Sequence, residues 1–189
     1  AGHENIDSAA AGVKGIPVCN CPGMNAVAVA ELAFGHMLNL DRRISLQTKS
    51  LREGRWNKKE FSKAKGLKGS NLLVVGMGSI GMELIKRAQA FEMNVSAQSR
   101  SMHKETARAL GIKMIEYSCD ALKAAIEDAD IVSVHVALCA DTDKLCGPGF
   151  FGAMKPGAMF INTSRGEIVD EQALIQAVRS EERRVGKEC

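Results

Sequence analysis

The stretch that most constrains the fold spans residues 72–81 and reads LLVVGMGSIG. Its first four residues are apolar, and such a short run is typical of a parallel strand that is covered on both faces. Gly76, Gly78 and Gly81 then form G-x-G-x-x-G, which permits a tight turn, a close approach of backbone to a diphosphate and close packing of the next helix. Residues 82–91 carry apolar side chains at helical spacing, so the positive end of this helix would face the turn. A bare glycine cluster is a weak signal, but the flanking strand and helix make this one a predicted dinucleotide-binding turn.

The rest of the chain alternates between short apolar runs and amphipathic segments, as expected of an α/β protein with a Rossmann-type doubly wound parallel sheet. Before the glycines, a long apolar-rich helix is expected from Asn25, its N-cap, toward Gly54, and a short strand at 13–21. The other predicted strands are 95–98, 112–115, 131–136 and 158–162, and the predicted helices are 103–110, 119–128, 148–154 and 171–178, the last capped by Asp170.

The end of the second predicted strand indicates which dinucleotide is bound. In NAD-binding sheets an acidic residue about 20 positions past the glycines holds the ribose hydroxyls. Here that place is taken by Ser99, followed by Arg100. A carboxylate would repel a 2′-phosphate, whereas a hydroxyl can donate to it and a guanidinium can pair with it. The sequence therefore favours NADP(H) over NAD(H), and the alternative is that Arg100 is a solvated loop residue and NAD is accepted.

Composition and charge exclude several other functions. The net charge of +3 over 189 residues is mild and evenly spread, which argues against nucleic acid as a partner. Without a run of about 20 apolar residues or a signal-peptide pattern, we expect a cytoplasmic protein with no membrane contact. The basic connector 52–71 is expected to be pinned to the surface by Trp56 and Phe61. No metal site is expected, and most of the six cysteines are predicted to be reduced core residues: Cys19, Cys21, Cys119, Cys139, Cys146 and Cys189.

Arg165 is the residue predicted to contact the substrate. It follows the predicted strand 158–162, and ligands of such sheets bind outside the carboxyl ends of the strands. A guanidinium there can take a substrate carboxylate in two parallel hydrogen bonds. From spacing alone, a surface arginine in a turn remains the alternative.

Five segments together resemble the D-isomer-specific 2-hydroxyacid dehydrogenases, most closely their 3-phosphoglycerate dehydrogenase-like branch. They are AGHENID, NCPGMNAVAVAE, LLVVGMGSIG, DIVSVHVAL and MKPGAMFINTSRGEIVDEQAL. The resemblance implies oxidation of a 2-hydroxy acid to its 2-oxo acid with a nicotinamide cofactor, and a homodimer formed around the helix from Asn25. It also implies the following roles: Gly76, Gly78 and Gly81 hold the diphosphate together with the N–H groups of Ser79 and Ile80; Val136 and Ala137 wall the cofactor cleft; Thr163 approaches the nicotinamide; and Arg165 is the catalytic arginine.

The sequence departs from the family pattern in a way that bears on activity. The family has a glutamate and then an acid–base histidine beyond the arginine, and the chain has neither of these segments. Loss of a general acid costs about 10²–10⁴ in rate. His135, on a predicted core strand, is interpreted as a packed residue. We therefore expect a fragment truncated at both ends and inactive alone, and the rival function is a non-catalytic dinucleotide-binding or corepressor-like module.

Three regions are expected along the chain. Residues 1–24 are interpreted as a remnant of the substrate domain and hinge, and 25–178 as the dinucleotide-binding domain. The last segment, 179–189, reads RSEERRVGKEC and back-translates to a sequence resembling an adapter oligonucleotide, so it is interpreted as a non-native tail. Its single apolar residue, Val185, predicts disorder or a frayed helix end.

Overall fold

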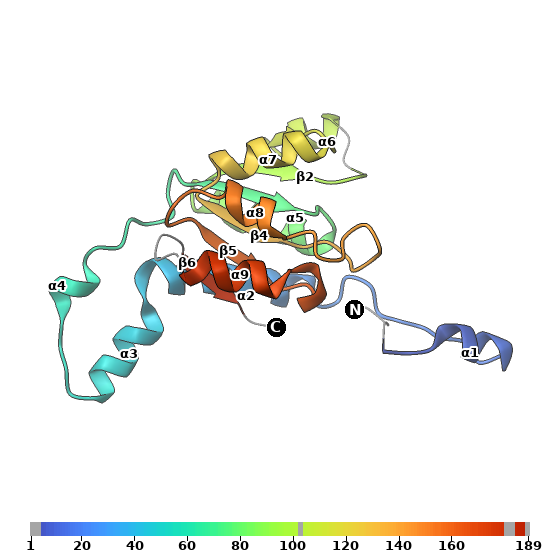
Figure 1. Ribbon diagram of the computed structural model, residues 1–189, viewed down its shortest axis with the longest axis horizontal. Coiled ribbons are helices and arrows are strands. Elements are labelled where there is room, and N and C mark those ends of the chain that lie inside the picture. Colours follow the sequence, from blue (N-terminus) through green and yellow to red (C-terminus); the bar gives the residue numbers. More distant parts are fainter. Residues whose placement is uncertain (1–4, 102–103, 180–183, 188–189) are drawn as a thin grey trace.

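A computed structural model describes residues 5–101, 104–179 and 184–187, the last four in backbone only. Within these residues the chain forms a sheet of six parallel strands in the order β3-β2-β1-β4-β5-β6. The order reverses between β1 and β4, which is the arrangement of a doubly wound sheet. The predicted fold class is therefore confirmed (Figure 1). The strands are β1 Asn71–Val75, β2 Asn94–Gln98, β3 Lys113–Ile115, β4 Ile131–Val134, β5 Met159–Asn162 and β6 Arg184–Lys187.

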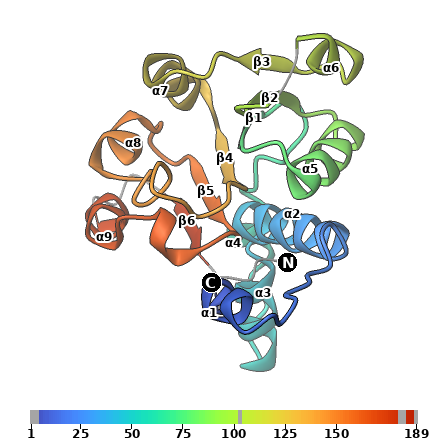
Figure 2. The ribbon, with the colours of Figure 1, turned by 90° about the vertical axis from the view of Figure 1, so that its right-hand side faces the viewer.

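Helices cover both faces of the sheet (Figure 2). One face carries α2 (Ala26–Arg42), α5 (Ser79–Ala90) and α6 (Lys104–Ala109). The other carries α7 (Cys119–Asp128), α8 (Pro148–Ala153) and α9 (Glu171–Arg179). Three further helices, α1 Ser8–Val13, α3 Ile44–Arg52 and α4 Lys58–Phe61, project from the body, α1 at one end and α3 with α4 at the other (Figure 1).

The apolar run that opens the glycine stretch forms the central strand because its side chains serve both layers. Leu72 and Val74 point into the core beneath α2 and α5, whereas Leu73 and Val75 point into the core beneath α7 and α8. This alternation explains why the run shows no polar residue, since both faces of β1 are covered. The second core is completed by an edge-to-face cluster of aromatic rings, with centroids 5.1–5.9 Å apart: Phe150, Phe151 and Phe160.

Most predicted elements are present, with boundaries shifted by a few residues. The helix predicted at 119–128 has those bounds, and the Asp170 carboxylate caps α9 by accepting from the backbone N–H of Gln172 and Ala173 at 3.0 and 3.1 Å. Asn25 occupies the N-cap position of α2, but its side chain makes no capping bond. The helix α5 begins three residues earlier than predicted, so that Gly78 is its N-cap.

The predicted long helix from Asn25 toward Gly54 is wrong in one respect, because Arg43 divides it into α2 and α3. Arg43 has a left-handed backbone (φ 55°), and the Asn39 side chain accepts from the backbone N–H of Ser45 at 2.8 Å, which fixes the second start. The short strand predicted at 13–21 is also wrong. Residues 8–13 are helical and 14–21 have no regular structure, since no neighbouring strand pairs with them in the described part of the chain.

Two predictions about individual side chains are wrong as well. Trp56 does not anchor the connector, because it is 79% exposed, whereas Phe61 is half-buried beneath the Arg43 guanidinium, 5.0 Å from its ring centroid. The prediction that most cysteines are core residues holds only for Cys146, whose thiol pKa is raised by burial to about 12. Cys189 lies outside the described residues. The other described cysteines are exposed: Cys19, Cys21, Cys119 and Cys139.

The expectation of disorder in 179–189 is wrong where the structure describes that segment. Arg179 ends α9, and β6 pairs in parallel with β5 through residues such as Val185 opposite Phe160. Without β6, β5 would be an edge strand with a row of unpaired backbone N–H and C=O groups. Pairing with β6 provides hydrogen-bond partners for these groups. Residues 180–183 and 188–189 lie outside the described residues.

Candidate cofactor and substrate site

The glycine turn fits its place at the carboxyl edge of the sheet because two of its glycines cannot carry a side chain. Gly76 has φ +97°, and a Cβ there would lie 2.7 Å from the carbonyl of His135. A Cβ on Gly81 would lie 2.4 Å from the carbonyl oxygen of Gly76. The turn and the first turn of α5 are therefore packed backbone against backbone, which no larger residue permits.

Gly78 differs from the other two glycines because the space beside it is open. A Cβ on Gly78 would meet no atom within 4 Å. Gly78 is the N-cap of α5, and no side chain caps that helix. The first N–H groups of a helix lack partners within it, so those of Ser79 and Ile80 are available to a ligand. The opening beside Gly78 is thus suited to a diphosphate at the positive end of α5.

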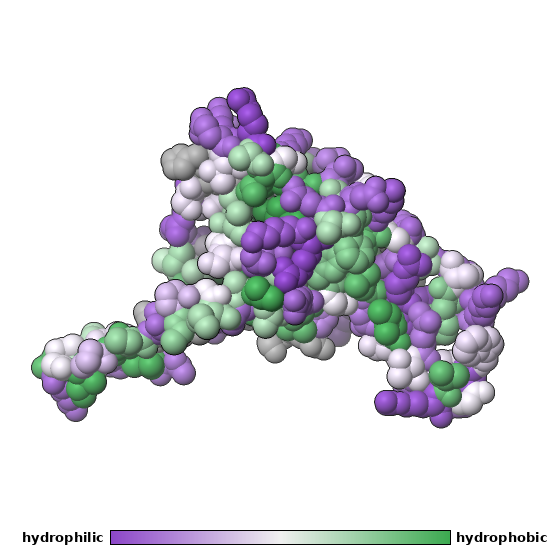
Figure 3. Space-filling view, turned by 180° about the vertical axis from the view of Figure 1, so that it is seen from behind, coloured by the Kyte–Doolittle hydropathy of each residue, from purple (hydrophilic) through white to green (hydrophobic). Residues whose placement is uncertain are grey.

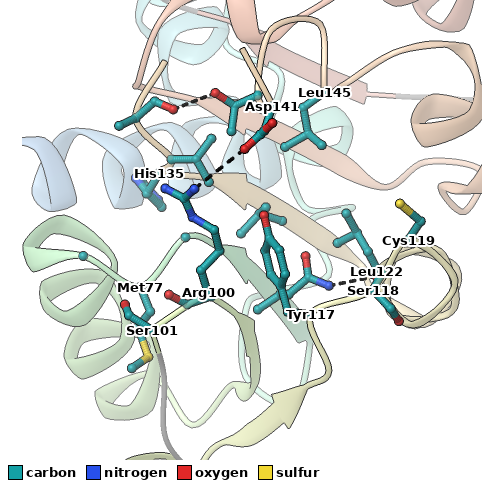
Figure 4. Close-up of a pocket in the computed structure, with 18 residues that line it drawn as sticks. Met77, Arg100, Ser101, Tyr117, Ser118, Cys119, Leu122, His135, Asp141 and Leu145 are labelled. Carbon is teal, nitrogen blue, oxygen red and sulfur yellow. Dashed lines mark hydrogen bonds and ion pairs between the residues drawn. The ribbon is translucent and has the colours of Figure 1, made fainter. Parts of the chain in front are cut away.

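Two adjoining cavities meet at this turn. The first has a volume of 480 Å³ and lies between the ends of β1, β2 and β4 (Figure 4). The second has a volume of 410 Å³ and lies between the start of α5, the segment 20–29 and the end of β5. Both are of a size that holds a small ligand or one end of a larger one. They share Gly78, His135, Val136 and Ala137 as lining residues, so the end of β4 forms the wall between them.

The predicted site residues divide between the two cavities. Gly76, Ser99 and Arg100 line only the first. Gly81 lines neither, because it is buried against the Gly76 carbonyl. The remaining predicted residues that line the second cavity only are Ser79, Ile80, Thr163 and Arg165. Ser99 and Arg100, predicted to lie at the ribose, are thus separated by the wall of β4 from Thr163 and Arg165, whereas the predicted diphosphate residues Ser79 and Ile80 line the same cavity as Arg165.

The first cavity contains residues that sequence analysis missed. Gln98, at the end of β2, is 5% exposed and donates to the backbone carbonyls of Glu116 and Ser118 at 2.8 and 3.2 Å. These bonds position the 116–118 loop, which brings Tyr117 to the cavity (Figure 4). The one available signal was a polar residue at the end of a predicted strand.

The loop after β4 is held in place by a buried hydroxyl. The Thr142 hydroxyl, on a residue that is 8% exposed, accepts from the backbone N–H of Cys139 at 2.8 Å and lies 2.7 Å from the carbonyl oxygen of Ala137. The same hydroxyl lowers the pKa of the exposed Cys139 thiol, with help from backbone N–H groups. Asp141, on the tip of this loop, lies 3.8 Å from the Arg100 guanidinium across the first cavity.

His135 is buried, as the sequence predicted, and its environment keeps the imidazole neutral near pH 7. Its backbone N–H donates to Val75 at 2.7 Å, and its Nε2 lies 2.8 Å from the Ser133 hydroxyl. Burial lowers its pKa to about 4. Within the described part of the chain its Nδ1 is buried without a hydrogen-bond partner. A neutral imidazole is a weak proton donor near pH 7, which argues against His135 as the family's general acid.

The second cavity carries a fixed turn and a buried orphan hydroxyl. The Asn162 side chain, on a residue that is 3% exposed, accepts from the N–H of Ser164 at 2.9 Å and donates to the carbonyl of Arg165 at 2.8 Å. The Ser164 hydroxyl bonds the carbonyl of Val134 at 3.0 Å, which ties the turn to β4. The Thr163 Oγ1 is buried and has no hydrogen-bond partner among the residues that the structure describes. Buried polar atoms are normally satisfied, so Thr163 presents an unmet hydrogen bond to a ligand.

These features define the class of the protein. The sheet is parallel, the helix after the glycine turn starts without a cap, and Gly78 leaves room for a diphosphate. The divided cleft lies where the strand order reverses. Together these features are those of a dinucleotide-binding domain. No set of three or more His, Cys, Asp or Glu side chains in the described part of the chain could hold a metal ion. None of the helices described is long and apolar enough to span a membrane.

Comparison with known proteins identifies the family. Residues 34–185 match the family described as D-isomer specific 2-hydroxyacid dehydrogenase, NAD binding domain, and the chain belongs to this family. The D-3-phosphoglycerate dehydrogenase of Archaeoglobus fulgidus is 40% identical over 179 residues, which cover 95% of this chain and 33% of that protein. The chain therefore spans about a third of the length of such relatives.

Solved structures agree with this assignment. The apo-structure of D-lactate dehydrogenase from Escherichia coli superposes with a TM-score of 0.86 at 29% identity, covering 98% of this chain and 58% of that one. An acyclic imino acid reductase solved in complex with NADPH and D-Arg has a TM-score of 0.82 at 27% identity, covering 96% of this chain and 56% of that one. The predicted family resemblance is therefore confirmed.

Proposed function

We propose that this chain is the cofactor-binding part of an enzyme that oxidises a 2-hydroxy acid to its 2-oxo acid, with 3-phosphoglycerate as one candidate substrate. The observation that carries the proposal is the divided cleft, in which the glycine turn opens to both cavities while Thr163 and Arg165 line only the second. A dinucleotide bound across the wall of β4 would have its adenosine half in the first cavity and its nicotinamide in the second.

In this proposal each predicted site residue has a defined task. Gly76 and Gly81 shape the turn, Gly78 leaves room for the diphosphate, and the N–H groups of Ser79 and Ile80 donate to it. Val136 and Ala137 form the wall over which the cofactor lies. The nicotinamide, when bound, would accept a hydride from the carbon that carries the hydroxyl group. Thr163 offers its orphan hydroxyl to the cofactor or substrate.

Arg165 would bind and orient the substrate carboxylate. Its backbone is fixed through Asn162, and its side chain, which is exposed at the second cavity, hydrogen-bonds the carbonyl of Ser164 at 3.0 Å. A bidentate guanidinium–carboxylate pair fixes both the position and the plane of a 2-hydroxy acid, and a lysine cannot reproduce it. His135 would not supply the proton transfer at the substrate oxygen, because it is neutral and buried.

The activity is tested with a protein extended to the length of the relatives. Arg165→Lys keeps the charge but not the two parallel bonds, so we expect kcat/KM with the 2-hydroxy acid to fall by about 10²-fold while NAD(P)H affinity stays within about twofold. Equal kcat/KM for the wild-type protein and Arg165→Lys would refute the role of Arg165. Dinucleotide binding without dehydrogenase activity in the extended wild-type protein would instead favour the corepressor-like alternative.

The preference for NADP(H) over NAD(H) belongs to the same proposal. It is supported by Ser99 and Arg100, which line the first cavity and take the place of an acidic residue that would repel a 2′-phosphate. It is also supported by the NADPH that a related structure holds. Calorimetric titration of the chain should give tighter binding of NADPH than of NADH, and Arg100→Ala should weaken NADPH selectively. Arg108→Ala is the matched control, because Arg108 is an exposed cation outside the cavity. Equal or tighter NADH binding by the wild-type chain would refute the preference.

A homodimer is also part of the proposal. The projecting helices carry large exposed apolar side chains, seen as green atoms on both extensions in Figure 3. On α3 and the segment after it these are Ile44, Leu46, Leu51 and Trp56. Such a patch is typical of an interface. Light scattering should show that the wild-type chain is a dimer and that the double variant Leu51→Ser with Trp56→Ser is a monomer. Ile175→Ser, on the body, is the control and should remain a dimer. A monomeric wild-type chain would refute the proposal. The cytoplasmic location remains a prediction from sequence.

A further inference from the structure

The first cavity has one pair of opposite charges at its opening. Of its lining residues, all within the described part of the chain, only Arg100 and Asp141 carry a formal charge at pH 7 if His135 is neutral. The two residues come from the loops after β2 and β4 and lie 3.8 Å apart, guanidinium Nη1 to carboxylate Oδ2. Figure 4 shows the Arg100 side chain extended across the cavity toward Asp141. The pair therefore bridges the opening through which a ribose with its substituents would enter.

The position of Asp141 is fixed by its neighbour rather than by Arg100. Thr142 is buried and bonded to both Cys139 and Ala137, so the loop tip stays in place whether or not the ion pair forms. The Arg100 and Asp141 side chains are 64% and 75% exposed, and an exposed pair at this distance is weak. A weak pair can be broken by a stronger anion, and a phosphate dianion is such a competitor for a guanidinium.

We propose that Asp141 is a second determinant of cofactor choice, because its carboxylate competes with a 2′-phosphate for the Arg100 guanidinium and so weakens binding of 2′-phosphorylated dinucleotides. The inference rests on the proposed function of the first cavity as the adenosine site. It assigns opposite effects to two neighbouring charges: Arg100 favours the phosphate, and Asp141 limits that preference. A dinucleotide with a free 2′-hydroxyl carries no charge at this position and is insensitive to both.

The inference is tested with two small probes that differ only in the 2′-phosphate, 2′,5′-ADP and 5′-AMP, by calorimetric titration of the whole chain. Asp141→Asn should strengthen binding of 2′,5′-ADP by about three- to tenfold and change binding of 5′-AMP by less than about twofold. Asp143→Asn is the matched control, because it removes the same charge two positions away on an exposed residue that does not line the cavity. It should leave both affinities unchanged.

A double variant separates competition from simple repulsion. If Asp141 acts by holding Arg100, the gain from Asp141→Asn should fall to less than half in an Arg100→Ala background. Equal 2′,5′-ADP binding by Asp141→Asn and wild type would overturn the inference. So would an equal gain in Asp143→Asn or with 5′-AMP, or a full gain in the Arg100→Ala background. The proposed NADP(H) preference fails separately, if the wild-type chain binds 5′-AMP as tightly as 2′,5′-ADP.

Discussion

Two glycines of the same turn should respond in opposite ways to one added methyl group. At Gly81 the new Cβ would lie 2.4 Å from the carbonyl oxygen of Gly76 and 3.4 Å from Cγ1 of Val74. The first contact is with backbone, so no change of rotamer can relieve it. At Gly78 the new Cβ would meet nothing within 4 Å, and the backbone angles there, φ −81° and ψ −166°, are accessible to alanine.

The expected magnitudes follow from these contacts. Overpacking of this kind costs about 1–3 kcal/mol or more, and the higher helix propensity of alanine offsets about 1 kcal/mol. Because the clash at Gly81 is with a backbone oxygen, the upper part of that range, about 2–3 kcal/mol, applies, so Gly81→Ala should lower the free energy of unfolding by about 1–2 kcal/mol, or about 2–8 °C in Tm. For Gly78→Ala the poorer N-cap and the stiffer unfolded chain nearly cancel, which leaves a change within about 1 kcal/mol.

Binding should show the reverse order. The methyl group of Gly78→Ala would stand in the open space between a diphosphate and the start of α5, and hydrogen bonds to a charged group contribute about 1.5–3 kcal/mol each. We expect NADPH affinity to fall by at least about tenfold. Thermal unfolding and calorimetric titration of both variants test this. Loss of stability in Gly78→Ala as large as in Gly81→Ala, or wild-type NADPH affinity in Gly78→Ala, would refute the reasoning.

Two further predictions concern buried polar residues. Because burial lowers the pKa of His135 to about 4, from 6.5, the unfolded chain takes up this proton first as the pH falls, so stability is lost between about pH 6.5 and 4. Urea unfolding should show a loss of about 2 kcal/mol from pH 7 to pH 5 that His135→Gln lacks, and equal losses in both proteins would contradict it. Asn162→Ala removes both bonds that fix the Ser164–Arg165 turn, so it should lower the free energy of unfolding by about 1–3 kcal/mol in the same urea experiment. An unchanged free energy of unfolding would show that the turn is held without Asn162.

The fold was predictable because its main signals are local. A parallel strand buried on both faces needs an uninterrupted apolar run, and the glycine turn needs residues without side chains, so both are visible in sequence. The break at Arg43 was not, because the bond of Asn39 to Ser45 gives no pattern in the sequence and the other contacts of Arg43 are with residues distant in the chain. The Arg43 guanidinium bonds the Glu60 carboxylate at 2.7 Å and covers Phe61. Such contacts form only after the connector folds back on the helix.

The exposed Trp56 marks a second limit of the same kind. The sequence predicted burial from the apolar character of the ring, which is sound when the only surface available is that of the same chain. Trp56 instead lies between α3 and α4, which project from the body (Figure 1), together with other exposed apolar residues, so that only a second molecule could cover it. The hydrophobicity of a residue does not indicate whether it packs against its own chain or against another molecule.

The site was predicted as a set of positions but not as an arrangement. Apart from Gly81, every predicted site residue lines one or both of the two cavities. The resemblance implied that Val136 and Ala137 wall the cleft, but not that the end of β4 divides it into two cavities. The pairing of Arg100 with Asp141 was not predicted either, since a loop beyond a strand gives no periodic signal of where its tip points. Tyr117 was missed for the same reason, because its place depends on the bonds that Gln98 makes to the loop.

The buried polar residues supply the signal that would have found more of the site. In the described part of the chain they are Asp41, Gln98, Ser133, His135, Thr142 and Asn162. All except Asp41 lie at or just beyond the carboxyl ends of β2, β4 and β5, around the two cavities. Burying a polar side chain is unfavourable unless it is hydrogen-bonded, and here Gln98, Thr142 and Asn162 bond the loops that carry the ligand-facing residues. A polar residue at the end of a strand is therefore expected to position a loop rather than to meet the ligand itself. The same logic sets apart His135 and Thr163, whose buried Nδ1 and Oγ1 find no partner among the described residues, because a molecule bound at this edge would satisfy both atoms.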